Sequence, residues 1–139
     1  MADNSYLPQT GDDLDLIGFA MEQQPSQTYK LDISRGRVKG VTADADALLQ
    51  AVYLILSVER YQYPIYSYNY GVELLDLIGR PKDFVMSEAK RRITEALTQD
   101  DRITSVSDWK FESTPKSLIA TFTVHSIYGA IETKKEVDV

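Results

Sequence analysis

The chain of 139 residues contains no cysteine, one histidine and one tryptophan. The lack of cysteine excludes disulfide bonds and cysteine-ligated zinc sites. A single histidine with scattered carboxylates does not supply the three or four converging ligands of a metal site. His125 has no Gly-x-Ser-x-Gly turn beside it in the sequence, and no glycine-rich phosphate-binding motif is present. We therefore expect no metal, no cofactor and no enzymatic activity.

Long apolar runs and basic clusters are also scarce. The longest apolar run, residues 51–56, is far shorter than the roughly 20 residues that cross a membrane. The N-terminus lacks the basic and apolar regions of a secretory signal, so we expect an intracellular site of synthesis and no membrane partner. The net charge is −6, and residues 90–92 form the only basic triplet. We expect no nucleic-acid partner, because phosphate neutralisation supplies most of that affinity.

Charge divides the chain into two regions. Residues 1–27 carry five acidic residues and no basic one, whereas residues 28–139 are nearly neutral. The first region predicts an acidic extended arm that becomes ordered on a partner. Its apolar docking residues would be Leu14, Leu16, Ile17 and Phe19. The second region is long enough for one domain with a buried core.

The first half of residues 28–139 predicts a hairpin followed by a helix. Alternating apolar residues indicate a strand over 28–34 and a return strand over 38–41, joined by a turn at Gly36. Helical spacing of apolar residues indicates a helix over 43–58 with Thr42 as its N-cap. The expected buried stripe of this helix is Leu48, Leu49, Val52, Ile55 and Leu56.

The second half predicts helices and then strands. A short helix is expected over 72–78 and a long one over 83–98. Strands are expected around 108–112, 118–125 and 131–137, the last polar enough to be an edge strand. The predicted fold is α+β: an N-terminal β-hairpin, two main helices and a C-terminal three-stranded antiparallel meander in one small sheet-and-helix domain.

The segment 59–71 is the most informative feature of the sequence. It contains five of the nine tyrosines, namely Tyr61, Tyr63, Tyr66, Tyr68 and Tyr70. A tyrosine has a rigid apolar ring with a polar tip, which suits a surface that is soluble alone and dry when docked. We therefore predict a docking segment. In the alternative, Tyr61, Tyr63 and Ile65 pack under the long helix and only the later three tyrosines are exposed.

Glu59 and Arg60, at the start of this segment, are interpreted as a pair that closes the helix end and fixes the chain that follows. Carboxylates near the aromatic rings also raise the alternative of a glycoside hydrolase, which needs only two carboxylates at a fixed separation. Glu59, Glu73 and Asp76 are the candidates. Such proximity is common by chance at this composition, so we favour the docking interpretation.

The sequence resembles the baseplate proteins of PBSX-type defective prophages and related contractile-tailed phages. This group belongs with the baseplate wedge, or sheath-initiator, proteins once labelled tail lysozyme-like. The resemblance extends over about residues 28–130, and segment 59–71 is its most specific part. It is carried by Thr28-Tyr29-Lys30-Leu31-Asp32, Val38-Lys39-Gly40, the helix 43–58, segment 59–71 and Asp100-Asp101-Arg102-Ile103.

The resemblance implies a structural protein of a contractile tail baseplate that joins wedge proteins and initiates sheath assembly. Its partners would be other baseplate proteins and tail sheath subunits in a hetero-oligomeric assembly, formed in the bacterial host cytoplasm and located in the virion tail baseplate. The edge strand 131–137 would accept a strand from a neighbour. A Glu-Pro-Arg motif of the wider family is replaced here by residues 100–102, which makes Arg102 the expected interface arginine.

The expected partner interface is thus Glu59, Arg60, Tyr61, Tyr63, Tyr66, Tyr68, Tyr70 and Arg102. Two alternatives remain open at this point. One is a cell-wall hydrolase associated with the tail, and the other is a regulatory anti-adapter of the same fold that binds a response-regulator-like partner.

Overall fold

The structure is a computed structural model that describes residues 26–139. The predicted acidic arm over 1–27 therefore lies, apart from its last two residues, outside the described residues. The elements are strands β1 (Thr28–Asp32) and β2 (Arg37–Thr42), helix α1 (Asp44–Ser57), the short 3₁₀-helix η1 (Leu75–Leu77), helix α2 (Lys82–Thr98) and strands β3 (Ile103–Ser113), β4 (Ser117–Ser126) and β5 (Gly129–Asp138).

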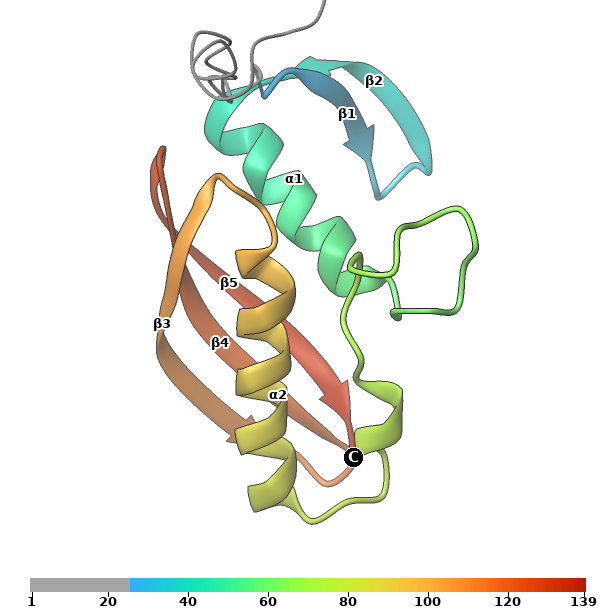
Figure 1. The fold of residues 1–139 in the computed structure, drawn as a ribbon, viewed down its shortest axis with the longest axis vertical. Coiled ribbons are helices and arrows are strands. Elements are labelled where there is room, and N and C mark those ends of the chain that lie inside the picture. The colour runs from blue at the N-terminus through green and yellow to red at the C-terminus, as the bar shows by residue number, and fades with distance from the viewer. Residues whose placement is uncertain (1–25) are drawn as a thin grey trace, which may run out of the picture.

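The strands form two antiparallel sheets. β1 pairs with β2 in a hairpin, and β3, β4 and β5 form a second sheet in sequence order with β4 in the centre. Figure 1 shows α2 lying along this three-stranded sheet, whereas α1 runs from the hairpin towards the middle of the molecule. The predicted α+β fold is confirmed, with β5 as an edge strand.

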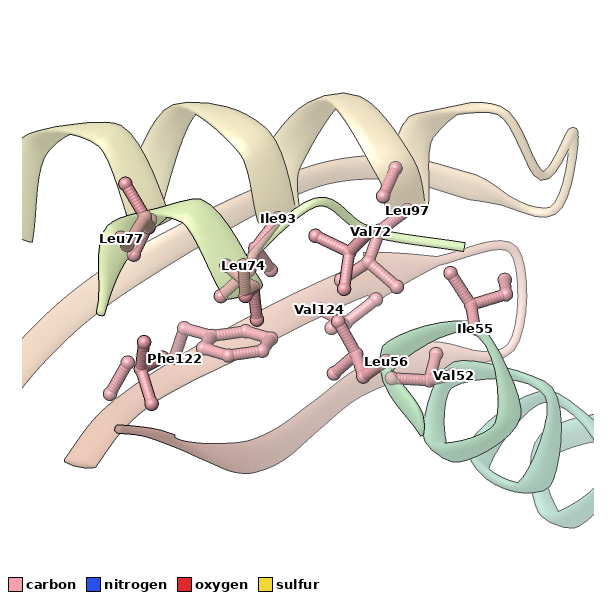
Figure 2. Close-up of a cluster of buried hydrophobic side chains, with 14 of the residues drawn as sticks. Val52, Ile55, Leu56, Val72, Leu74, Leu77, Ile93, Leu97, Phe122 and Val124 are labelled. Atoms are coloured by element: carbon pink, nitrogen blue, oxygen red, sulfur yellow. The ribbon is translucent and has the colours of Figure 1, made fainter. Parts of the chain in front are cut away.

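The core lies between β4 and the two helices. Phe122 and the other alternate residues of β4, Leu118, Ala120 and Val124, are fully buried. A stripe on α2 with a spacing of four residues faces them and is also fully buried: Val85, Ala89, Ile93 and Leu97. Figure 2 shows side chains of α1, η1, α2 and β4 meeting in this cluster. Apolar residues alternate along β4 and recur every four residues along α2, so in each element the buried side chains lie on one side.

The opposite face of β4 carries the intervening residues, which are partly exposed. His125 is one of them, and its Nε2 lies 2.6 Å from the Ser107 hydroxyl on β3. In the described part of the chain, no group of three or more histidines, cysteines or carboxylates is placed to hold a metal ion. A search of the same residues finds no helix long and apolar enough to cross a membrane.

The helix starts differ from the sequence prediction. Helix α1 begins at Asp44, and its N-cap is Ala43 without a side-chain hydrogen bond, so the assignment of Thr42 as N-cap was wrong. Thr42 instead ends β2, where it pairs with Thr28. The short helix expected over 72–78 is reduced to η1, because Val72 is held in an extended bridge with Glu59.

Strand β3 begins earlier than the sequence predicted, at Ile103 rather than near residue 108. Its register against β4 shifts between Ser107 and Lys110, which places a bulge at Asp108 and Trp109. Asp108 has φ +55°, a left-handed conformation that Asp tolerates better than most residues. The bulge interrupts the alternation of side chains, and this is why the pattern concealed the first half of the strand.

Candidate docking surface at the tyrosine loop

Residues 60–71, here named the tyrosine loop, leave the end of α1 and return to the same place. The Val72 N–H donates to the Val58 carbonyl at 3.0 Å, and the Arg60 N–H donates to the Val72 carbonyl at 3.3 Å. These bonds bring the two ends of the loop side by side. Figure 1 shows the loop in green, projecting beyond the end of α1 away from the three-stranded sheet.

Gly71 permits this closure at the end of the loop. Its φ is +91°, and a Cβ added there would lie 2.5 Å from the Val58 carbonyl oxygen. Side-chain-bearing residues avoid this conformation, and real Cβ atoms do not approach an oxygen so closely. The sequence therefore needs glycine at this position for two separate reasons.

Arg60 fastens the closed loop to α2. Its side chain is only 9% exposed. The guanidinium donates from Nε and Nη2 to the Gly71 carbonyl at 3.3 and 3.1 Å, and from Nη1 to Glu95 Oε1 at 3.1 Å. Glu73 lies 3.7 Å from the same Nη1. Arg60 thus bridges the end of the loop and the middle of α2.

Glu59 holds the segment that follows the loop by hydrogen bonds to its backbone. Its carboxylate accepts hydrogen bonds from the backbone N–H of Leu74 at 3.0 and 3.1 Å and of Leu75 at 3.1 Å. These groups open η1, whose first N–H groups have no partner within the helix. Among the ion pairs of residues 26–139, none joins Glu59 to Arg60. The two residues fix the segment separately, not as a mutual pair.

The tyrosine rings are arranged outside this frame. Tyr66 stacks on Tyr70 with ring centroids 4.7 Å apart, and Tyr63 meets Tyr66 edge-on at 6.3 Å. Tyr61 lies 6.3 Å from Tyr68. Such pairs add stability beyond the burial of their area, so the rings support one another.

The exposure of the rings decides between the two predictions for this segment. Tyr61, Tyr63, Tyr66 and Tyr68 are between 42% and 82% exposed, and Ile65 is 84% exposed. The alternative in which Tyr61, Tyr63 and Ile65 pack under the long helix was therefore wrong.

Tyr70, which that alternative left exposed, is the ring that packs against the core. Burial, with a smaller contribution from the nearby Tyr66, raises the pKa of its hydroxyl.

Arg102, the eighth predicted interface residue, is paired within the chain. Its Nε and Nη2 donate to the two carboxylate oxygens of Asp100 at 2.9 and 2.6 Å, and its backbone N–H donates to Asp100 Oδ1 at 3.0 Å. Partial burial alone would raise the pKa of Asp100, but these bonds outweigh it and hold that pKa below its usual value. Asp100 borders a cavity of about 360 Å³ with Tyr70 and Gly71, which places the pair near the tyrosine loop.

A second surface lies between the hairpin, α1 and β5. It is a groove of about 620 Å³, and its apolar lining includes Ile33, Leu49 and Tyr53 beside the edge formed by residues 132–136. Sequence periodicity placed Leu49 in the buried stripe of its helix, but it is 45% exposed, because it faces this groove. No pattern in the sequence indicated this groove.

Gln50 holds the hairpin against α1. Its amide oxygen accepts the Leu31 N–H at 2.9 Å, and its amide nitrogen donates to the Tyr29 carbonyl at 2.8 Å. The side chain therefore bonds the edge of β1 much as a neighbouring strand would. An isolated two-stranded hairpin is at best marginally stable, so this bridge positions the groove wall.

Exposed aromatic rings on a closed frame are features of a structural protein-docking domain. So is a strand edge beside an apolar groove that no other described strand covers. The comparisons with known proteins agree. The chain belongs to the family of contractile injection system sheath initiators, whose family model matches residues 25–129. The Phage-like element PBSX protein XkdS of Bacillus subtilis (strain 168) is 37% identical over 113 residues, which cover 78% of this chain and 80% of that protein. The predicted resemblance is confirmed, and the chain has a structural role in a phage-type contractile tail.

Proposed function

We propose that this protein works in the tail baseplate, where it joins wedge components and provides the sheet on which the first sheath subunits assemble. Its family membership and its two free surfaces support this role. In the proposal, the protein acts within a hetero-oligomeric baseplate that is put together in the host cytoplasm. The residues perform no chemistry on a substrate in this role.

The outer edge of β5, with which no strand of residues 26–139 pairs, is the observation that carries the proposal. β5 pairs with β4 along its whole length, from Gly129 opposite Ser126 to Asp138 opposite Ser117. As the last strand of the sheet, it presents its other edge to the groove between the hairpin and α1. An extended segment of a sheath subunit could add here through main-chain hydrogen bonds, while the groove receives its apolar side chains. The charges at Glu132, Lys134 and Glu136 discourage unspecific pairing of this edge.

The tyrosine loop is the proposed contact with a baseplate neighbour. Residues 61–70 carry no charged side chain, and four of their five tyrosines are exposed. Rigid rings of this kind dominate the energy of many protein interfaces, because they bury a large area with little loss of conformational entropy. The same neighbour would contact Arg102 and Asp100 as one fixed pair, since their side chains are already hydrogen-bonded to each other.

Electron microscopy of tail particles from cells that lack this chain tests the proposed function. We expect baseplates or tubes without sheaths, and we expect the wild-type protein to restore the sheaths. Intact contractile tails that fail only at penetration of the host wall would contradict the proposal and would favour a cell-wall hydrolase instead.

Substitution of both Tyr66 and Tyr68 by serine is expected to abolish sheathed tails while the protein stays folded. Tyr68 is 82% exposed, so its loss removes little buried area, and the loss of the stack between Tyr66 and Tyr70 should lower the free energy of unfolding by about 1 kcal/mol. Sheathed particles are counted by electron microscopy, and stability is measured by urea denaturation.

Tyr29→Ser provides the matched control for the double variant. Tyr29 is 71% exposed, between Tyr66 and Tyr68, but it lies on β1, outside both the tyrosine loop and the lining of the groove. We expect its substitution to leave sheath formation intact. A double variant that assembles normally would exclude the tyrosine loop from the interface. A stability loss of several kcal/mol would show instead that the two rings serve the core.

A further inference from the structure

We propose that Glu59 and Arg60 are positioning residues that hold the tyrosine loop in its docking shape before a partner arrives. This inference rests on the proposed role of the loop as a docking surface. Glu59 and Arg60 thus differ in role from the exposed tyrosines, because the polar atoms of Glu59 and Arg60 bond to other residues of the same protein.

The geometry of Arg60 supports a role inside the protein. A guanidinium at the centre of an interface would present its planar donor group to the neighbour. Here Nε, Nη1 and Nη2 are all engaged, with the Gly71 carbonyl and with Glu95 of α2. The side chain is almost completely covered. Its bonds connect positions 60, 71 and 95, which lie on three different parts of the chain.

Glu59 and Arg92 hold the segment that follows the loop. Glu59 holds the start of η1 through the N–H groups of Leu74 and Leu75. Arg92 donates from α2 to the Glu73 carbonyl at 3.0 Å and forms an ion pair with Asp76. Hydrogen bonding to Arg92 lowers the pKa of Asp76, which is the direction expected for a carboxylate that gains a cationic partner. The chain on both sides of the loop is therefore tied to one rigid helix.

Preformation matters because a flexible loop must lose conformational freedom when it binds. That loss reduces affinity unless the loop is already ordered in the free protein. Within the stretch 61–70 the backbone hydrogen bonds are two local turns, from the Tyr66 N–H to the Tyr63 carbonyl and from the Tyr70 N–H to the Ser67 carbonyl. The other restraints described above are the contacts between its rings and the packing of Tyr70 against the core. If the frame is released, we expect the rings to remain available but the loop to sample many shapes.

Hydrogen exchange of the isolated full-length protein provides the first measurement. In Arg60→Gln we expect amide exchange across residues 61–72 to become at least about tenfold faster, with β4 unchanged. Arg37→Gln is the control, because Arg37 lies on β2 and, among the described residues, its ion pair is with Asp32 of the same hairpin. It should leave the exchange of the loop unchanged. Arg60→Lys keeps the positive charge but has a single donor nitrogen in place of three, and it should restore part of the protection.

Addition of each purified variant to sheath-free particles from cells that lack the chain provides the second measurement. We expect Arg60→Gln to require at least about tenfold more protein than the wild type for half-maximal binding, and Arg60→Lys to fall between them. If Arg60→Gln fails to fold, Glu95→Gln removes only one partner of Arg60 and should give a smaller change in the same direction.

The two measurements together distinguish the possibilities. Faster loop exchange together with weaker binding supports the positioning role. Weaker binding with unchanged loop exchange would make Arg60 a contact residue, and faster exchange with unchanged binding would show that preformation is unimportant; either result overturns the inference. If the wild-type protein itself does not bind the particles, the proposed docking function fails, whatever the exchange data show.

Discussion

Substitution of Phe122 by alanine is expected to destabilise the protein by about 3–5 kcal/mol. Phe122 lies at the centre of β4 and is fully buried. The Trp109 ring stacks on Phe122 at a centroid distance of 4.6 Å. Figure 2 shows Phe122 among the side chains of α2 and η1. The substitution removes the ring and leaves a cavity, because the helix and the sheet around it are fixed by many other contacts.

Urea denaturation of the purified protein measures this effect through the midpoint of the unfolding transition. Thr121→Ala is the control, since Thr121 directly precedes Phe122 on β4 but lies on the partly exposed face of the sheet. We expect that control to cost less than about 1 kcal/mol. A loss below about 1 kcal/mol for Phe122→Ala would mean that the core does not centre on this ring.

Substitution of Gly71 by alanine is expected to have the second largest effect, a loss of about 2–4 kcal/mol. Two penalties add at this position. A residue with a Cβ is strained at φ +91°, and the new methyl group would collide with the Val58 carbonyl, the acceptor of the Val72 N–H. The backbone must shift to relieve this contact, so we expect the tyrosine loop to lose its closure as well.

Gly79→Ala separates the two penalties for Gly71. Gly79 has a similar φ of +81°, but no atom lies within 4 Å of the position of an added Cβ. It should therefore show only the conformational penalty, about 1 kcal/mol. The test compares the two unfolding free energies by urea denaturation. Equal losses for the two variants would exclude a steric role for the Val58 carbonyl.

Much of the fold could be predicted from local patterns. Apolar residues recur every four residues in α2 and alternate in β4, and both patterns predict which side of the element is buried. The structure buries those sides. The edge character of β5 followed from its polar composition. Residue type also indicated the exposed tyrosines, because an apolar ring with a polar tip suits a surface that is soluble alone, although Tyr70 packs against the core.

The errors arose where a residue's role depends on a distant part of the chain. Leu49 fits the apolar period of α1 but is exposed, because the course of the hairpin is not encoded in that period. Thr42 is a suitable N-cap by residue type, yet β2 extends to include it. The bulge at Asp108 ended the alternation from which strands are recognised, so half of β3 went unpredicted.

The sequence by itself determined the elements, the exposed aromatic segment and the family of this protein, because each depends on residue types and short-range spacing. Only the tertiary structure decided how the surface is built. Arg60 reaches Glu95, and Gln50 bonds the edge of β1, across separations of 35 and about 20 residues. Such contacts form when helices and strands pack, and no local pattern specifies which polar side chains will then face each other.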